Sequence, residues 1–147
     1  YGIGFVKNKY IGRSFIQPTQ AMRENAVRIK LNVLKSTVEG KRVIMVDDSI
    51  VRGTTSKRIV NLLRRFGATE VHVRSSAPPF KHPCYFGTDV PSSDQLIATN
   101  RTIDEMIGAD TLGYLKVERL HEMVEGLNIC EGCFTGKYPV ETDKYLD

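Results

Sequence analysis

Two adjacent acids and a small hydroxylated segment form the part of this sequence best suited to chemistry. Asp47 and Asp48 directly follow an apolar run, and the segment Arg52-Gly53-Thr54-Thr55 comes shortly after them. Neighbouring carboxylates repel each other, so a ligand or cation that neutralises them would stabilise the pair. Amides at a helix start, together with threonine hydroxyls, favour a phosphate. A sugar phosphate would satisfy both halves. The plainer alternative is a solvated strand end before a helix that Thr54 caps.

The surrounding elements predict where this stretch lies in a fold. Residues 42–46 (RVIMV) form an apolar run typical of an inner parallel strand that is covered on both faces. A helix is predicted over 55–66, with Gly67 after it, and the next strand over 70–75. Strand, helix and strand in succession form a right-handed βαβ unit. The sequence therefore predicts an α/β fold, with a Rossmann-like parallel sheet flanked by helices and ligands at its carboxyl edge.

The remaining elements are predicted from breakers and periodicity. Gly12 and Pro18 interrupt the basic, aromatic segment 7–20, which is expected to be irregular. From Pro18 to Leu34 the spacing of apolar residues predicts a helix. The other predictions are a short strand or loop over 1–6, a long loop over 77–94, a short helix around 102–108, a last strand over 111–116, a last helix over 117–127, and turns beyond it.

Three cysteines form a second candidate centre. Cys130 and Cys133 make a C-x-x-C pair, and Cys84 lies well upstream. The spacing by itself leaves several alternatives open: a metal cluster, a zinc site completed by His82 or His121, a redox pair, or inert thiols. A thioredoxin-like pair is disfavoured because C-x-x-C follows the last predicted helix. The histidines, including His72, are more typical of packing or surface positions than of catalysis.

Composition bounds the function classes. The chain has 147 residues, a net charge of +4, 41% apolar residues and 26% charged residues, as expected for a single soluble domain. No apolar run approaches the roughly 18 residues of a membrane span. We therefore expect a cytoplasmic protein with no membrane or nucleic-acid partner. A nucleic-acid binder would instead show steeply salt-dependent affinity. The start at Tyr1, inside an apolar run, leads us to expect a piece of a longer protein.

Several stretches together resemble one family. VIMVDDSIVRGTTS resembles the loop with which type I phosphoribosyltransferases bind phosphoribosyl pyrophosphate (PRPP). KNKYIGRSFIQPTQAMRENAVRIKLNVL, HPCYFGTD, IGADTLGYL and CEGCFTGKYP extend the likeness to the amidophosphoribosyltransferases, also called glutamine PRPP amidotransferases. The resemblance implies transfer of ammonia, released from glutamine, to PRPP. The products would be 5-phosphoribosylamine and pyrophosphate, in the first step of purine nucleotide synthesis.

The resemblance also implies roles for individual residues. Asp47 and Asp48 would hold the ribose hydroxyls and the Mg²⁺ environment. It places Arg52, Gly53, Thr54 and Thr55 around the 5-phosphate and adds Ser49 to the residues that bind PRPP. Arg13 and Lys30 would face the pyrophosphate, assisted by Lys7 and Tyr10, and Ile16 would line an ammonia path. Basic groups suit this leaving group because its charge grows as the bond breaks.

The cofactor and partners implied by the family concern the rest of the chain. Cys84, Cys130 and Cys133 would be three ligands of a structural [4Fe–4S] cluster, whose fourth cysteine would lie upstream of Tyr1. Residues 1–147 would form the C-terminal portion of the phosphoribosyltransferase domain, with the fold incomplete at its N-terminal side and the N-terminal glutaminase domain absent. We expect this chain alone to be inactive and the intact protein to be a homo-oligomer. The alternative is a non-catalytic module that senses PRPP or a purine nucleotide.

Overall fold

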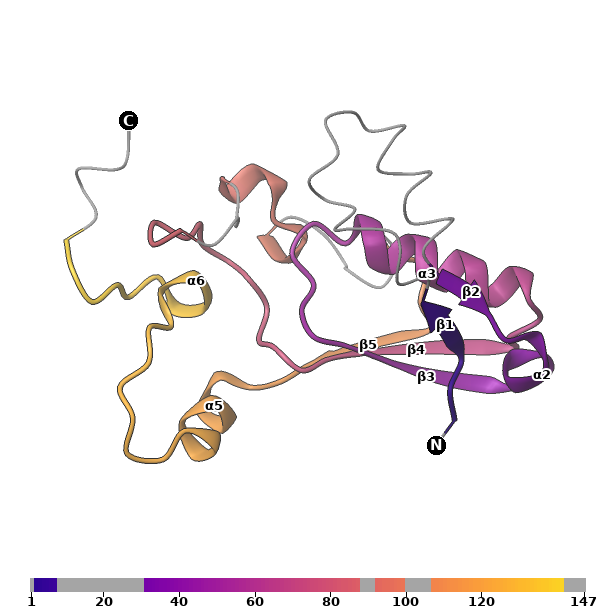
Figure 1. Cartoon of the computed structure of the whole chain (residues 1–147). Coiled ribbons are helices and arrows are strands. Elements are labelled where there is room, and N and C mark those ends of the chain that lie inside the picture. Colours follow the sequence, from indigo (N-terminus) through magenta and orange to yellow (C-terminus); the bar gives the residue numbers. More distant parts are fainter. Residues whose placement is uncertain (1, 8–30, 88–91, 100–106, 142–147) are drawn as a thin grey trace.

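A computed structural model describes residues 2–7, 31–87, 92–99 and 107–141. Within these ranges a small three-stranded sheet carries one long helix, and shorter elements extend from both ends (Figure 1). The elements in chain order are β1 (Phe5–Lys7), β2 (Leu31–Val33), α2 (Lys35–Val38), β3 (Arg42–Asp47), α3 (Thr54–Arg65), β4 (Glu70–Ser75), η2 (Ser93–Gln95), η3 (Ile97–Thr99), β5 (Thr111–Tyr114), α5 (Val117–Met123) and α6 (Gly132–Thr135).

The main sheet has the order β3-β4-β5, and both of its strand pairs are parallel. Asp47 pairs in register with Ser75, and Ser75 with Tyr114, so all three strands end at one edge. The predicted βαβ unit and the α/β fold class are therefore confirmed. β1 and β2 form a separate antiparallel pair. In Figure 1 α3 lies along one face of the sheet, and α5 and α6 lie beyond the carboxyl ends of the strands.

The core lies between α3 and the sheet. Val60 and Leu63 of α3 are fully buried, as are Val71 and Val73 of β4. Their spacing follows helical periodicity on α3 and alternation on β4, which brings one apolar face of each element together. Ile59 of α3 is partly buried against the same cluster. The helix ends as predicted before Gly67, which has φ of +93°.

The burial of β3 differs from the prediction. Met45 is buried under α3, but Ile44 is 67% and Val46 72% exposed. The apolar run led us to expect cover on both faces, whereas in the described chain only one face of β3 is packed. Apolar composition alone does not say which of the two faces has a neighbouring layer.

Two helix predictions also need correction. The helix predicted from Pro18 to Leu34 does not extend to its end, because Leu31–Val33 forms β2 and pairs with Phe5–Lys7. Cross-strand pairing outweighs the helical spacing of apolar residues in this segment. Residues 8–30 lie outside the described residues, as does most of the helix predicted around 102–108. The last helix, α5, ends at Met123 rather than at Leu127.

The C-terminal turns contain one helical turn that the sequence did not predict, α6. Phe134 of α6 packs edge-on against Phe80, with ring centroids 4.9 Å apart. Phe80 and Leu96 form the buried centre of a second, smaller apolar cluster. Within the described ranges, no helix combines the length and apolar character needed to cross a membrane.

Candidate functional site

The acidic pair lies at the carboxyl edge of the sheet, as predicted. Asp47 is the last residue of β3 and is half-buried, while Asp48 is exposed. The amide of Asp48 donates to Asp47 Oδ1 at 3.1 Å, and Ser49 Oγ donates to Asp48 Oδ1 at 3.3 Å. Each carboxylate thus accepts a hydrogen bond from a donor of the next residue in the chain.

Electrostatics at this edge favour a compensating ligand. Burial raises the pKa of Asp47 above its ordinary value, and the neighbouring charge of Asp48 raises it further. The Asp48 amide and the Ser56 hydroxyl oppose that shift by donating to the ionised form. Burial and the charge of Asp48 both make the ionised form of Asp47 less favourable. A cation or hydroxyl donor bound there offsets the desolvation and the repulsion, so its binding is favoured.

Two serines that sequence reasoning missed surround the acidic pair. Ser56, in the first turn of α3, is 2% exposed, and its Oγ donates to Asp47 Oδ2 at 3.5 Å. Ser76 follows β4 and donates to the backbone of the pair. A signal for Ser56 was present in the sequence, since it shares the helical spacing of Val60 and Leu63 and is therefore a polar residue on the apolar face.

The loop after the acids turns into α3 at Gly53. This glycine has φ of +71°, and a Cβ built on it would lie 2.2 Å from Cδ1 of Ile97. The family resemblance places Gly53 near the 5-phosphate. The structure provides two reasons for a glycine here, since a side chain would both strain the backbone and collide with a buried isoleucine. Ile97, which donates its amide to Val51 O at 3.0 Å, thereby supports the loop from behind.

The start of α3 has the features of an anion site. Gly53 is the N-cap residue, and no side chain caps the helix among the described residues. The alternative in which Thr54 is the cap is therefore wrong. Thr54 and Thr55 are exposed, and Arg52 is half-buried in the same loop. The uncapped amides of a twelve-residue helix and two exposed threonines therefore follow the acidic pair within one short loop.

Most of the residues predicted to face pyrophosphate lie outside the residues that the structure describes. Arg13, Lys30, Tyr10 and Ile16 lie outside the described residues. Lys7 ends β1, where it stands opposite Leu31 of β2. Their roles stay predictions.

The three cysteines come from the loop after β4 and from the α6 region, which together are called the cysteine end. The amides of Lys81 and His82 both donate to Cys133 O, at 2.9 and 3.1 Å. Cys84 and Cys133 contact the apolar cluster around Phe80, whereas Cys130 is an exposed, free thiol. Burial raises the pKa of Cys133, and the charges of Cys84 and Cys130 add to that effect.

No three His, Cys, Asp or Glu side chains of the described residues are arranged as ligands of one metal ion. The zinc alternative with His82 or His121 therefore finds no support. His121 Nε2 instead lies 2.9 Å from Glu131 Oε2. His72 contacts Thr111 and Glu70 on the sheet, which agrees with the structural role expected for it.

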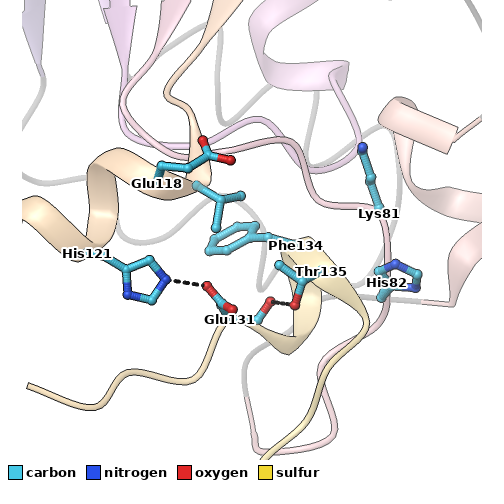
Figure 2. A pocket seen from close by; sticks show the side chains of 8 residues that line it. Lys81, His82, Glu118, His121, Glu131, Phe134 and Thr135 are labelled. Carbon is cyan, nitrogen blue, oxygen red and sulfur yellow. Dashed lines mark hydrogen bonds and ion pairs between the residues drawn. The ribbon is translucent and has the colours of Figure 1, made fainter.

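A pocket of about 550 Å³ lies beside the cysteine end (Figure 2). Figure 2 shows His121 and Glu131 facing each other on one side of Phe134, and Lys81 and His82 on the other. The pocket has both acidic and basic side chains, and its lining residues are far from Asp47 in the sequence. Its lining residues are Lys81, His82, Val117, Glu118, His121, Glu131, Phe134 and Thr135.

Comparison with known proteins gives a consistent result. No family model matches the chain. The amidophosphoribosyltransferase of Bacillus subtilis is 53% identical over 150 residues, a match that covers 96% of this chain and 32% of the relative. The amidophosphoribosyltransferase of Methanocaldococcus jannaschii is 51% identical and covers 97% and 31%. The chain thus spans about a third of the length of these relatives.

Solved structures agree with the sequences. Glutamine PRPP amidotransferase from B. subtilis, complexed with ADP and GMP, is similar with a TM-score of 0.78 and 53% identity. That match covers 96% of this chain and 33% of the other. A second structure, described as the allosteric regulatory enzyme of purine biosynthesis, gives 0.79 at the same identity, over 96% of this chain and 32% of its own.

The parallel sheet with its acidic carboxyl edge thus defines a phosphoribosyltransferase-class α/β fold. Within this class the chain belongs, over the matched residues, to the amidophosphoribosyltransferases.

Proposed function

We propose that this chain carries the PRPP-binding part of an amidophosphoribosyltransferase. The intact protein would transfer ammonia, released from glutamine, to PRPP and form 5-phosphoribosylamine and pyrophosphate, the first step of purine nucleotide synthesis. One observation carries the proposal: an acidic pair ends β3 immediately before the uncapped start of α3. The 53% identity to the B. subtilis enzyme over 96% of the chain supports it.

The residues of this edge divide between two parts of the substrate. Asp47 and Asp48 would accept hydrogen bonds from the ribose hydroxyls. Ser49, Arg52 and the amides that begin α3, with the hydroxyls of Thr54 and Thr55, would bind the 5-phosphate. Rigid attachment of both groups to one strand and one helix would hold the sugar in a fixed orientation, which lowers the entropic part of the barrier.

The acidic pair also fits a magnesium ion. Mg²⁺ prefers oxygen ligands and keeps several waters, so one or two carboxylates and the substrate's own oxygens suffice. Asp47 and Asp48 supply carboxylates at the sheet edge, one half-buried and one exposed. When bound, the ion would neutralise charge on the departing pyrophosphate. Arg13 and Lys30, with Lys7 and Tyr10, are proposed to act on the same group.

The cysteine end supplies the residue type that an iron–sulfur cluster uses, although in the described residues the three side chains are not arranged around one metal ion. Cys84 and Cys133 contact one apolar cluster, and the charges of Cys84 and Cys130 act on Cys133. We propose that these three thiolates, with a fourth from outside this chain, hold a [4Fe–4S] cluster. Its contribution would be structural, because ammonia transfer involves no change of oxidation state, and it would tie α6 to the loop around Cys84.

The second candidate is a non-catalytic module that binds PRPP or a purine nucleotide. One observation favours nucleotide recognition: the B. subtilis relative was solved in complex with ADP and GMP. The acidic pair and helix start suit a ribose phosphate of either ligand, so this candidate would use the same residues without releasing pyrophosphate.

One experiment separates the two candidates. A protein of full amidotransferase length that carries this sequence is incubated with PRPP, ammonia and Mg²⁺, and pyrophosphate release and phosphoribosylamine formation are measured. We expect both products. Saturable PRPP binding without pyrophosphate release would support the sensor, and absence of binding would contradict both candidates.

A further inference from the structure

Ser56 occupies an unusual place for a polar side chain. It is 2% exposed and lies on the buried face of α3 between the helix start and the core residue Val60. Its Oγ donates to Asp47 Oδ2 at 3.5 Å, while the Asp48 amide donates to the other oxygen of the same carboxylate at 3.1 Å. Both oxygens of Asp47 therefore have a donor from the protein, and water has little access to compete with the serine.

Ser76 acts on the same pair from the neighbouring strand. Its Oγ lies 3.2 Å from both the Asp47 and the Asp48 carbonyl oxygens, so its single proton is shared between them. Its amide also donates to Asp47 O at 2.9 Å. The end of β3 is thereby attached to the end of β4 just where the regular ladder stops.

We propose that Ser56 and Ser76 are positioning residues for the acidic pair, Ser56 by orienting the Asp47 side chain and Ser76 by holding the backbone of Asp47 and Asp48. Neither serine is proposed to touch the substrate. This inference rests on the proposed function, since it assigns the reason for which the two carboxylates must be held.

The physical need for such positioning follows from the like charges. Two adjacent carboxylates repel each other. A free Asp47 side chain would therefore rotate away from Asp48, and its carboxylate would no longer point toward the sugar. A donor on each oxygen restricts that rotation before the substrate arrives. Fixed acceptors bind hydroxyls more tightly than mobile ones, because less side-chain entropy is lost on binding.

The chain offers a matched control in Ser75. This serine is also buried, at 5% exposed, and its Oγ donates to a backbone carbonyl, that of Ala77, at 2.9 Å. Ser75→Ala therefore removes a buried serine hydroxyl at the same sheet edge without removing a hydrogen bond to either aspartate. Any general effect of losing such a hydroxyl appears in this variant too.

The first measurement is PRPP binding, in the presence of Mg²⁺, to a protein of full amidotransferase length that carries this sequence, by calorimetry. We expect Ser56→Ala to weaken binding about fivefold, and Ser76→Ala by a smaller factor because its amide contact remains. Ser75→Ala is expected to bind like the wild type, and Ser56→Thr, which keeps the hydroxyl, to restore affinity. Equal losses in Ser56→Ala and Ser75→Ala would overturn the proposal.

The second measurement needs no substrate. Three-bond couplings in a labelled, ligand-free chain report whether the Asp47 side chain occupies one χ1 rotamer or several. We expect one rotamer in the wild type and in Ser75→Ala, and averaging in Ser56→Ala. Should Ser56→Ala not fold, Ser56→Cys keeps the volume with a weaker donor and is expected to show the same averaging. A single, unchanged rotamer in the folded Ser56 variants would overturn the proposal.

The two measurements distinguish failure of the proposed function from failure of the positioning role. If the wild type shows no PRPP binding while Ser56→Ala releases the Asp47 rotamer, the proposed function is wrong and the structural coupling stands. If PRPP binds and neither Ser56→Ala nor Ser76→Ala changes its affinity, the proposed function survives and the positioning role is wrong.

Discussion

The acidic edge and the cysteine end of this chain are assembled in opposite ways. The acidic edge comes from one continuous stretch, residues 43–60, in which β3 passes through a loop directly into α3. The cysteine end joins two stretches far apart in the sequence, the loop near Cys84 and the α6 region near Cys133. The first is therefore visible as a motif, while the second exists only when the chain has folded.

The two regions also differ in what holds them. Residues of the acidic edge lie against the main core, where Val60, Leu63 and Val73 are fully buried. The cysteine end depends on a small cluster around Phe80 and on a few hydrogen bonds, among them Tyr138 Oη to Pro83 O at 2.7 Å. Regions with few buried contacts open locally at low free energy. The comparison teaches that fewer buried side chains hold the cysteine end than the acidic edge, so we expect the cysteine end to open locally at a lower free energy.

The largest expected effect tests the chemistry of the acidic edge. Asp47→Asn with Asp48→Asn should weaken PRPP binding by about 100-fold or more, since hydrogen bonds to charged acceptors are lost at two positions. The fold should remain, as judged by circular dichroism. The control is Glu70→Gln, which removes an acid from the opposite end of β4, where it pairs with Arg42. Wild-type affinity in the double variant would exclude the aspartates from the site.

The next test concerns the rigidity of the loop. Gly53→Ala should destabilise the fold by about 2–3 kcal/mol, from left-handed strain and from collision with Ile97. Gly40→Ala is the matched control, because it has the same φ of +71° but no atom within 4 Å of the added Cβ. It should cost only about 1 kcal/mol. Ile97→Val should recover part of the Gly53→Ala loss, and equal costs at both glycines in urea unfolding would contradict this account.

The independence of the cysteine end can be tested through Phe134→Ala. Loss of the contact with Phe80 should lower the local opening free energy of this end by about 2 kcal/mol. Hydrogen exchange measures it directly, because the Lys81 and His82 amides both donate to Cys133 O. These amides should lose protection, whereas the Ser76 amide at the acidic edge should keep it. Loss of protection at Ser76 would mean that the two regions unfold together.

A smaller effect comes from the pH dependence of stability. The folded pKa of Asp47 is raised, so its carboxylate lowers stability above that pKa, and the cost disappears as the pH falls below the ordinary value of 3.8. Asp47→Asn should therefore stabilise the metal-free chain near neutral pH by about 0.5 kcal/mol, a figure reduced for partial exposure. Thermal unfolding at neutral and acidic pH measures the difference.

Asp110→Asn is the comparison, because it should change the stability at neutral pH in the opposite direction to Asp47→Asn. The Val71 amide, at 2.6 Å, and Arg64, at 2.9 Å, bind the Asp110 carboxylate and lower its pKa. The stability it contributes is present above its unfolded pKa and is lost as the pH falls through the folded one. Asp110→Asn should therefore lower the melting temperature at neutral pH and have less effect in acid. The same sign for both variants would refute the assignment of these shifts.

The smallest effect is a difference in thiol reactivity. Cys130 is exposed, whereas Cys133 is half-buried and burial raises its pKa. Iodoacetamide should therefore modify Cys130 several-fold faster than Cys133 at neutral pH, because the thiolate is the reactive form. Peptide mass spectrometry over time measures both rates. Phe134→Ala should reduce the difference by opening the cluster around Cys133.

Local patterns predicted the central elements well. The strand–helix–strand order, the position of Asp47 at the end of β3, and the stop before Gly67 all follow from periodicity and turn chemistry over a few neighbouring residues. Prediction was wrong where pairing between distant segments decided the outcome. Leu31–Val33 pairs with Phe5–Lys7 as a strand although its spacing is helical, and Ile44 and Val46 are exposed although the run is apolar.

The sequence by itself determined that an acidic pair and a helix start would stand together, because both belong to one connected stretch whose geometry is local. Only the tertiary structure decided what surrounds them: Ser56 and Ser76 as donors to the pair, and Ile97 behind Gly53. It also decided that Cys84 meets the C-x-x-C segment. The physical reason is that these contacts depend on how separate elements pack, and packing geometry is not encoded in the spacing of residues along the chain.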